Sequence, residues 1–173
     1  DFNKANFHYN RGVEKFTGGN YSGAISDFSK AIKLNPTDAD AYYNRGVAKG
    51  LVKDESGELA DYNNVIDINP SFGEAYSNRG ILKRKLGDYS GAIADYKMAI
   101  KLNPTDAEAY YNRGIAKGIL KDYSGAISDF KKALEIKPKF DQAYRKLQNA
   151  KKKLGSNSAT GEKKAQAEKK ALA

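Results

Sequence analysis

Residues 109–138 read AYYNRGIAKGILKDYSGAISDFKKALEIKP, and related stretches precede them at a constant spacing of 34 residues. Asn-Arg-Gly recurs in step with this spacing, at residues 10–12, 44–46, 78–80 and 112–114. The only prolines keep the same spacing: Pro36, Pro70, Pro104 and Pro138. A fixed period of this length is typical of solenoids, in which each repeat buries its apolar face against a neighbour.

The period divides the chain into four repeats, a final helix and a tail. We expect the repeats at residues 5–38, 39–72, 73–106 and 107–140. The final helix is expected at 141–154. Its side chains would cover the last open face of the array with Tyr144, Leu147 and Leu154. Residues 155–173 begin with a Gly- and Ser-rich stretch and then become basic, so we expect a flexible basic tail there.

Each repeat is expected to form two helices. The second helix ends at the repeat proline, because proline lacks an N–H donor and disfavours helical geometry in the residue before it. Asp88 and Asp122 precede second helices at a position from which an aspartate can cap them. Thr105 and Glu108 have the spacing of a capping box at the start of a first helix.

These repeats resemble tetratricopeptide repeats, which have a bulky residue, Gly, Tyr, Ala, an aromatic residue, Ala and Pro at fixed offsets. The third repeat shows the whole pattern: Tyr76, Gly80, Tyr89, Ala92, Tyr96, Ala99 and Pro104. The resemblance covers about residues 5–154. It implies an all-α, right-handed superhelix of antiparallel helix pairs. It also implies a non-catalytic scaffold or adaptor that binds an extended peptide or a partner protein in a concave groove.

The second repeat departs from this pattern. Glu58 stands where the other repeats have alanine, and Glu55 replaces a tyrosine. An unpaired carboxylate between helices is costly. We therefore expect the second helix of this repeat to begin late or to splay, so that Glu58 reaches solvent. The alternative is a functional soft point in the superhelix.

The residue before the repeat glycine is usually apolar in this family, yet here it is always Arg11, Arg45, Arg79 or Arg113. An aspartate follows at a fixed distance in each second helix: Asp27, Asp61, Asp95 and Asp129. The matched series predict bidentate, partly buried contacts with a structural role. The final helix has Leu147 at the arginine position and no following aspartate, which favours pairing within a repeat.

In tetratricopeptide arrays the first helices line the concave face, so the resemblance places two rows of side chains there. The aromatic row consists of Tyr9, Tyr43 and Tyr111. The amide row consists of Asn10, Asn44, Asn78 and Asn112. Regularly spaced amides can hydrogen-bond the backbone of an extended peptide, and this row resembles the asparagine ladder of O-linked N-acetylglucosamine transferases. The alternative is that the asparagines tolerate solvent or support the arginines, and that the tyrosines are half-buried packing.

The ligand is expected to be a mixed-charge extended segment. Arg84 and Lys85, with Lys83, are expected to form the only basic cluster of the groove. Some co-chaperones of this family hold a C-terminal carboxylate with a clamp of Lys, Asn and Arg side chains. The aligned positions here hold Tyr9, Val13, Asn44, Glu74 and Asn78, so a heat-shock-protein tail is not the expected ligand.

The sequence offers no catalytic constellation. The only histidine, His8, takes the place of a core aromatic residue. The chain has no cysteine, no Ser/His/Asp set, no carboxylate-rich metal cluster and no phosphate-binding loop. We therefore expect no enzyme activity, no metal and no cofactor.

The net charge of +9 comes from one end of the chain. Residues 1–130 are balanced, whereas residues 131–173 carry thirteen basic and four acidic groups. An alternative function is therefore electrostatic anchoring of residues 145–173 to RNA or to an anionic membrane. No aromatic residue lies beyond Tyr144, so base stacking is unavailable there and such binding would be weak.

The compartment and the oligomeric state stay open. The chain begins at Asp1 rather than Met, so it is either processed or a piece of a longer chain. No run of residues is apolar for long enough to cross a bilayer. A cytoplasmic protein and a protein exported after removal of its signal both fit.

Overall fold

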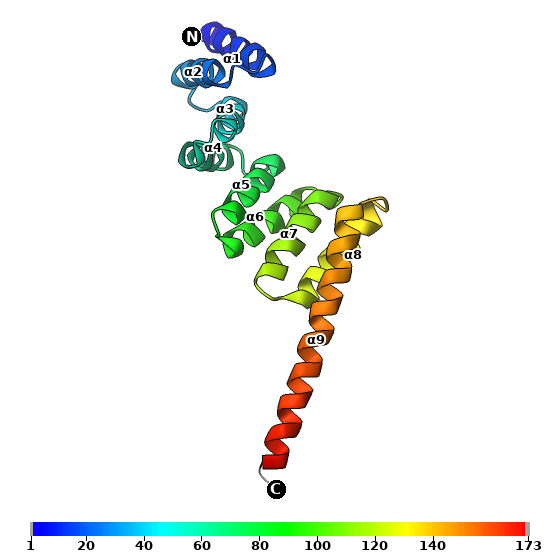
Figure 1. Ribbon diagram of the computed structural model, residues 1–173. Helices are drawn as coiled ribbons and strands as arrows, with labels where there is room; N and C mark the ends of the chain where they lie inside the picture. The colour runs from blue at the N-terminus through cyan, green and yellow to red at the C-terminus, as the bar shows by residue number, and fades with distance from the viewer. Residues whose placement is uncertain (1, 172–173) are drawn as a thin grey trace. The chain divides into compact units, whose positions relative to one another are not determined.

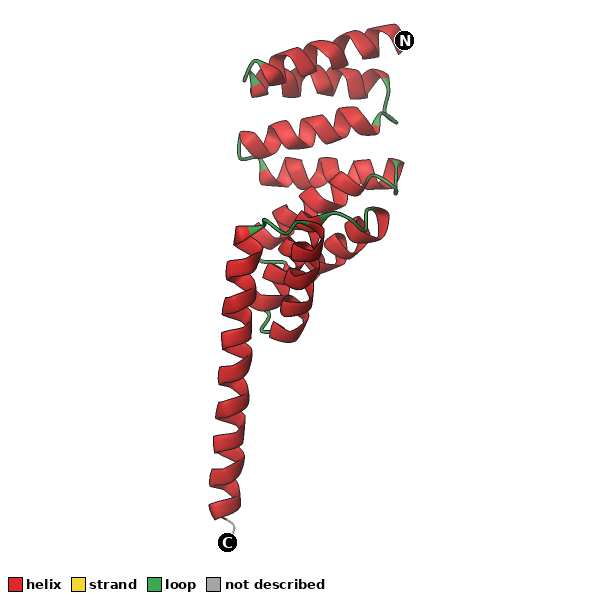
Figure 2. Cartoon of the chain, turned by 90° about the vertical axis from the view of Figure 1, so that its right-hand side faces the viewer, coloured by secondary structure: helices red, strands yellow, loops and turns green. Residues whose placement is uncertain are grey.

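The computed structural model describes the backbone of residues 2–171 and the side chains of residues 2–156. Within these residues the chain forms nine α-helices and no strand (Figure 1). Short loops join the helices (Figure 2). The chain divides into two compact units, Asp1–Leu82 and Lys83–Ala173.

The first unit is built from two complete helix pairs and the greater part of a fifth helix. Its elements are α1 (Phe2–Thr17), α2 (Tyr21–Leu34), α3 (Ala39–Leu51), α4 (Glu55–Ile68) and most of α5 (Gly73–Lys85). Within this unit, α3 packs against both α2 and α4. Each repeat therefore buries its apolar face on the next one, as the period predicts.

The second unit contains the end of α5 and four further helices. They are α6 (Tyr89–Leu102), α7 (Ala107–Ile119), α8 (Tyr123–Ile136) and α9 (Asp141–Ala171). Here α7 packs against α6 and α8, and α9 packs against α8 and touches α7.

Caps fix the start of the second helices. Asn20, Asp54, Asp88 and Asp122 each accept a hydrogen bond from the backbone N–H three residues on. The predicted caps at Asp88 and Asp122 are confirmed. The capping box predicted at Thr105 is wrong: Asp106 caps α7, and the Thr105 hydroxyl instead donates to Asn103 Oδ1 at 2.9 Å.

The turns between the paired helices need a left-handed residue. Gly19 and Gly87 take this conformation with φ of 78° and 86°. At the equivalent positions Lys53 and Lys121 have φ of 65°, which is strained for a residue with a side chain.

Glycine allows the helices of one repeat to approach closely. A Cβ atom on Gly114 would lie 2.7 Å from Cε1 of Phe130, and one on Gly12 would lie 2.7 Å from Cε1 of Phe28. Phe28 and Phe130 are almost completely buried, so no side chain could be added at either glycine without displacing the core.

The structure corrects the expectation for Glu58. Helix α4 begins at Glu55, the position at which α2, α6 and α8 begin, so it does not start late. Glu58 is half-buried, and a Cβ on Gly50 would lie 2.8 Å from its carboxyl carbon. The absence of a side chain at Gly50 therefore makes room for Glu58 at the helix crossing.

Helix α9 also differs from the expectation. It runs without a break from Asp141 to Ala171, where the sequence favoured a flexible segment from residue 155. Glycine and serine lower helix propensity but do not stop a helix that lacks a proline. The side chains beyond Ser156 lie outside the described residues. Leu147 is buried in the core as predicted, but Tyr144 and Leu154 are 56% and 40% exposed.

Candidate functional site

The repeat arginines pair with aspartates of the same repeat. In repeats 1, 2 and 4 the Nε and Nη2 atoms of the arginine donate to the two carboxylate oxygens at 2.5–2.9 Å. The pairs are Arg11–Asp27, Arg45–Asp61 and Arg113–Asp129. The predicted pairing within a repeat is confirmed for these three.

In all four repeats a lysine also pairs with the repeat aspartate, a contact that was not predicted from the sequence. The lysine four residues after the arginine reaches the same aspartate at 2.7–2.9 Å: Lys15–Asp27, Lys49–Asp61, Lys83–Asp95 and Lys117–Asp129. Residues four apart share one helix face, so the repeated Arg-x-x-x-Lys spacing could have revealed the second cation. Lys83 therefore belongs to this structural network.

The electrostatic consequence is clearest at Asp27. Hydrogen bonds from Arg11, and further from Lys15, hold the pKa of the Asp27 carboxyl well below its usual range despite the opposing effect of burial. The same hydrogen bond raises the pKa of the Arg11 guanidinium. The carboxylate is buried, ionised at neutral pH and paired with two cations, so it stabilises the fold.

In the first unit the predicted aromatic and amide rows bond to one another. Asn44 Nδ2 donates to Tyr9 Oη at 2.9 Å, and Asn78 Nδ2 donates to Tyr43 Oη at 3.0 Å. Each bond joins a first helix to the first helix of the next repeat. Burial raises the pKa of both tyrosines, so their hydroxyls stay protonated. These two bonds thus join successive repeats, which differs from the predicted structural alternative in which the asparagines tolerate solvent or support the arginines.

The asparagine side chains have more hydrogen-bonding groups than their bonds to tyrosine use. Each primary amide has two N–H groups and a carbonyl oxygen. Asn44 donates one N–H group to Tyr9, whereas Asn78 hydrogen-bonds both Tyr43 and Tyr62. Asn44 and Asn78 are half-buried, and Asn10 is exposed. Contact of these asparagines with a peptide stays a prediction.

In the second unit Tyr111 is the central residue of the predicted site. Its ring packs against Phe130 and Phe140, with centroids 6.0 Å and 4.7 Å away. Burial, and next the charge of Glu108, raise the pKa of the Tyr111 hydroxyl, while Arg84 and Arg145 oppose this shift. Arg84, which lies near the end of α5, thus lowers the pKa of Tyr111. Asn112 is half-buried beside Tyr111 in α7, and Lys85 is exposed.

Two adjoining hollows lie between α7 and α9. The first has a volume of about 310 Å³, and its lining includes Ile115, Ile119, Tyr123 and Lys153. The second, of about 450 Å³, is lined by Tyr111, Gln142, Arg145, Lys146 and Asn149. Lys146 and Asn149 line both hollows, so together they form one groove, which we call the α7–α9 groove.

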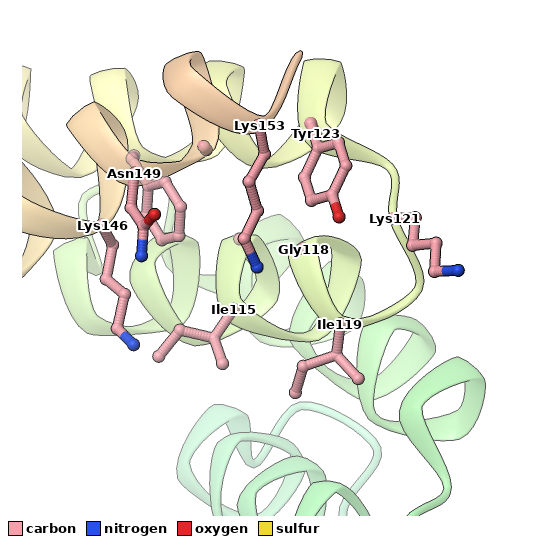
Figure 3. Close-up of a pocket in the computed structure, with 11 residues that line it drawn as sticks. Ile115, Gly118, Ile119, Lys121, Tyr123, Lys146, Asn149 and Lys153 are labelled. Carbon is pink, nitrogen blue, oxygen red and sulfur yellow. The ribbon is translucent and has the colours of Figure 1, made fainter. Parts of the chain in front are cut away.

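The α7–α9 groove is apolar on one side and basic on the other. Figure 3 shows Lys146 and Lys153 extending from α9 toward Ile115 and Ile119 of α7, whereas Lys121 points away from them. No Asp or Glu lines either hollow. The expectation that Arg84 and Lys85 form the only basic cluster is therefore wrong, because the final helix adds Arg145, Lys146 and Lys153.

Comparison with protein families agrees with this geometry. The family described as TPR repeat matches residues 14–51 and 82–118, and the family described as Tetratricopeptide repeat matches residues 107–140. Together these matches cover more than half of the chain. The chain belongs to the tetratricopeptide repeat family. Its fold is the all-α tetratricopeptide solenoid, and proteins of this family are typically non-catalytic interaction scaffolds.

Solved structures of tetratricopeptide repeat proteins are similar to this chain. A crystal structure of MamA superimposes with a TM-score of 0.85 at 24% identity, covering 88% of this chain and 83% of MamA. The first tetratricopeptide domain of Spaghetti (RPAP3), bound to the HSP90 peptide SRMEEVD, has a TM-score of 0.67 at 27% identity, covering 70% and 96%. YrrB, described as having an unusual peptide-binding site, has a TM-score of 0.75 at 21% identity, covering 82% and 73%.

Two further findings concern relatives of the chain and its helices. No curated protein sequence matches it. Among the described residues, no helix combines the length and the apolar character that crossing a membrane requires.

Proposed function

We propose that this tetratricopeptide protein is a non-catalytic scaffold that binds an extended peptide or a segment of a partner protein. The observation that carries the proposal is the α7–α9 groove. It is open to solvent, has an apolar floor, and contains Asn149 and Gln142, whose amides can hydrogen-bond a peptide backbone. Apolar surface with a few convergent polar groups is typical of binding sites.

Similar proteins support this use of the fold. The Spaghetti (RPAP3) domain is described in complex with a peptide, and YrrB is described as having a peptide-binding site. A heat-shock-protein tail is not the ligand that we propose, because the clamp positions lack the required cations. They hold Tyr9, Val13, Asn44, Glu74 and Asn78.

The residues predicted from the sequence are proposed as further contacts within each unit. In the first unit these are Tyr9, Asn10, Tyr43, Asn44 and Asn78. In the second unit they are Arg84, Lys85, Tyr111 and Asn112. Because Asn44 and Asn78 also join the repeats, their replacement would mix loss of binding with loss of stability. Tyr111 lines the α7–α9 groove, and Ser77 occupies the same position in the third repeat. Because the Tyr111 ring also packs against Phe130 and Phe140, circular dichroism must show that the Tyr111→Ser variant is folded before its binding is interpreted.

The proposal is tested by selecting peptides from an unbiased phage-displayed library against the intact chain. The affinities of the selected peptides are then measured by fluorescence anisotropy for the wild type and for Tyr111→Ser. Tyr144→Ser is the matched control, because Tyr144 is an exposed tyrosine of α9 that lines neither hollow. We expect weaker binding only for Tyr111→Ser. Failure to select any peptide, or equal affinities for all three proteins, contradicts the proposal.

A further inference from the structure

We infer that the α7–α9 groove is specific for an acidic peptide that carries a large apolar side chain. This inference rests on the proposed function and names the chemical class of the ligand. The apolar side chain would enter the hollow beside Ile115 and Ile119, and the acidic side chains would meet the cations of α9.

The floor of the groove can accept an apolar group. Ile115 and Ile119 lie one helical turn apart on α7, and Ile119 is 46% exposed although it is large and apolar. The glycines Gly114 and Gly118 lie on the same helix and also line this hollow, which keeps it open. A leucine or phenylalanine side chain placed here would remove apolar surface of both partners from water.

The rim of the groove selects for negative charge. Arg145, Lys146 and Lys153 line the two hollows from α9 without any lining carboxylate. The acidic group that acts on Tyr111 is Glu108, and it is already paired with Lys137 at 3.2 Å. An acidic ligand would therefore meet three cations with no carboxylate among the lining residues, which favours association and its rate.

A peptide fits these groups better than RNA does. Single-stranded nucleic acid is usually held by bases that stack on free aromatic faces. The aromatic rings of the groove already contact other side chains. Tyr111 packs against Phe130 and Phe140, and Lys153 lies 5.7 Å from the ring centroid of Tyr123. The exposed apolar floor consists of branched aliphatic side chains, which suit an apolar side chain of a peptide.

Lys151 provides a matched control for Lys146 and Lys153, because it lies on a different face of α9. At 100° per residue, Lys146 and Lys153 lie within about 20° of each other around the helix, whereas Lys151 lies about 140° or more from both. Lys151 is exposed and lines neither hollow. Charge reversal at Lys151 therefore changes the net charge of α9 without changing the charge of the groove.

The test uses the full chain and fluorescein-labelled synthetic peptides composed of Glu, Asp, Leu and Phe. Matched peptides carry Gln and Asn, or Lys, in place of the acidic residues. Binding is measured by fluorescence anisotropy for the wild type, for Lys146→Glu with Lys153→Glu and for Ile119→Ser. The control with the same change in charge is Lys151→Glu with Lys152→Glu, because Lys152 is also exposed and lines neither hollow. Circular dichroism verifies that each variant is folded.

We expect the acidic peptide to bind the wild type at least about ten times more tightly than its amide counterpart at low salt, because the cations of α9 attract its negative charges. Reversal of Lys146 and Lys153 should weaken this binding about tenfold, and Ile119→Ser about fivefold, whereas the control should retain more than half of the affinity. Equal binding of all three peptides, or equal loss in the groove variant and the control, would overturn the inference. Binding of oligouridine that depends on Lys146 and Lys153 and displaces the peptide would also overturn it.

The same measurements separate this inference from the proposed function. If the unbiased library yields peptides that need Tyr111 but are neither acidic nor sensitive to Lys146 and Lys153, the scaffold function stands and the acidic specificity fails. If neither the library nor the designed peptides bind, both fail.

Discussion

Arg113 of α7 donates two hydrogen bonds to Asp129 of α8, at 2.9 Å and 2.6 Å, although the Asp129 side chain is only 4% exposed. Lys117 lies 2.8 Å from the same carboxylate. One buried anion thus holds two cations of the neighbouring helix. Replacement of this anion leaves both cations without their partner at the centre of a repeat.

We predict that Asp129→Ala lowers the free energy of unfolding by about 3–5 kcal/mol, because breaking a buried ion pair from one side strands the remaining charge. Urea denaturation measures the change. Glu135→Ala is the control, since Glu135 forms an exposed pair with Lys132 and its loss should change stability little. Similar losses for the two variants would show that the buried pair has no special role.

The lowered pKa of Asp27 predicts how its contribution depends on pH. The unfolded chain protonates this carboxyl near pH 4, whereas the folded chain keeps it ionised to lower pH. The stabilisation is therefore complete above about pH 4 and is lost as the pH falls toward the folded-state pKa. Urea unfolding of the wild type and Asp27→Asn should show a stability difference that is constant near neutral pH and shrinks below about pH 4. A difference that grows on acidification would contradict the prediction.

Two glycines of α7 should respond to alanine with opposite signs. A Cβ on Gly114 would lie 2.7 Å from Phe130, whereas one on Gly118 would lie 3.8 Å from the Cβ of Ala126. Gly114→Ala should lower stability by about 1–3 kcal/mol through overpacking. Gly118→Ala should raise it by up to about 1 kcal/mol through helix propensity. Thermal unfolding of the two variants is sufficient, and stabilisation by both would show that the Phe130 contact is not rigid.

The hydrogen bond from Asn78 to Tyr43 should contribute to stability without any ligand. Tyr43→Phe removes the acceptor and should cost about 0.5–1.5 kcal/mol, the usual net value of such a bond. Tyr144→Phe, at an exposed position of α9, is expected to leave stability unchanged within error. If Tyr43→Phe is also neutral in urea denaturation, the bond from Asn78 to Tyr43 does not stabilise the contact between the repeats.

Much of the fold follows from the sequence, because its determinants repeat or act locally. The prolines end second helices, aspartates cap them, and the matched Arg and Asp series predict pairing within a repeat. The lysine partners were missed although their spacing was visible, because lysine at a helix surface is also compatible with solvent. The fit of Glu58 depends on Gly50 across the helix crossing, which only the packed structure reveals.

The candidate site was harder to predict. Tyr111 was identified from the repeat pattern. Three of the cations near it come from α9, which continues the period as a first helix but has basic residues at the tyrosine and asparagine positions of the repeat. Arg145, Lys146 and Lys153 looked like part of a basic tail. Their convergence with Ile115 and Ile119 depends on how α9 packs beside α7, and no local rule gives that arrangement.

The central claim, that the chain binds a peptide in the α7–α9 groove, is tested most directly by nuclear magnetic resonance. A selected peptide is titrated into the intact, isotope-labelled chain, and the shifted backbone and methyl signals are mapped. The account predicts that the largest changes lie at Tyr111, Ile115, Ile119 and Asn149, with little change at Tyr144 and Lys151. Changes confined to Tyr144, Lys151 and the other groups outside the groove would contradict it.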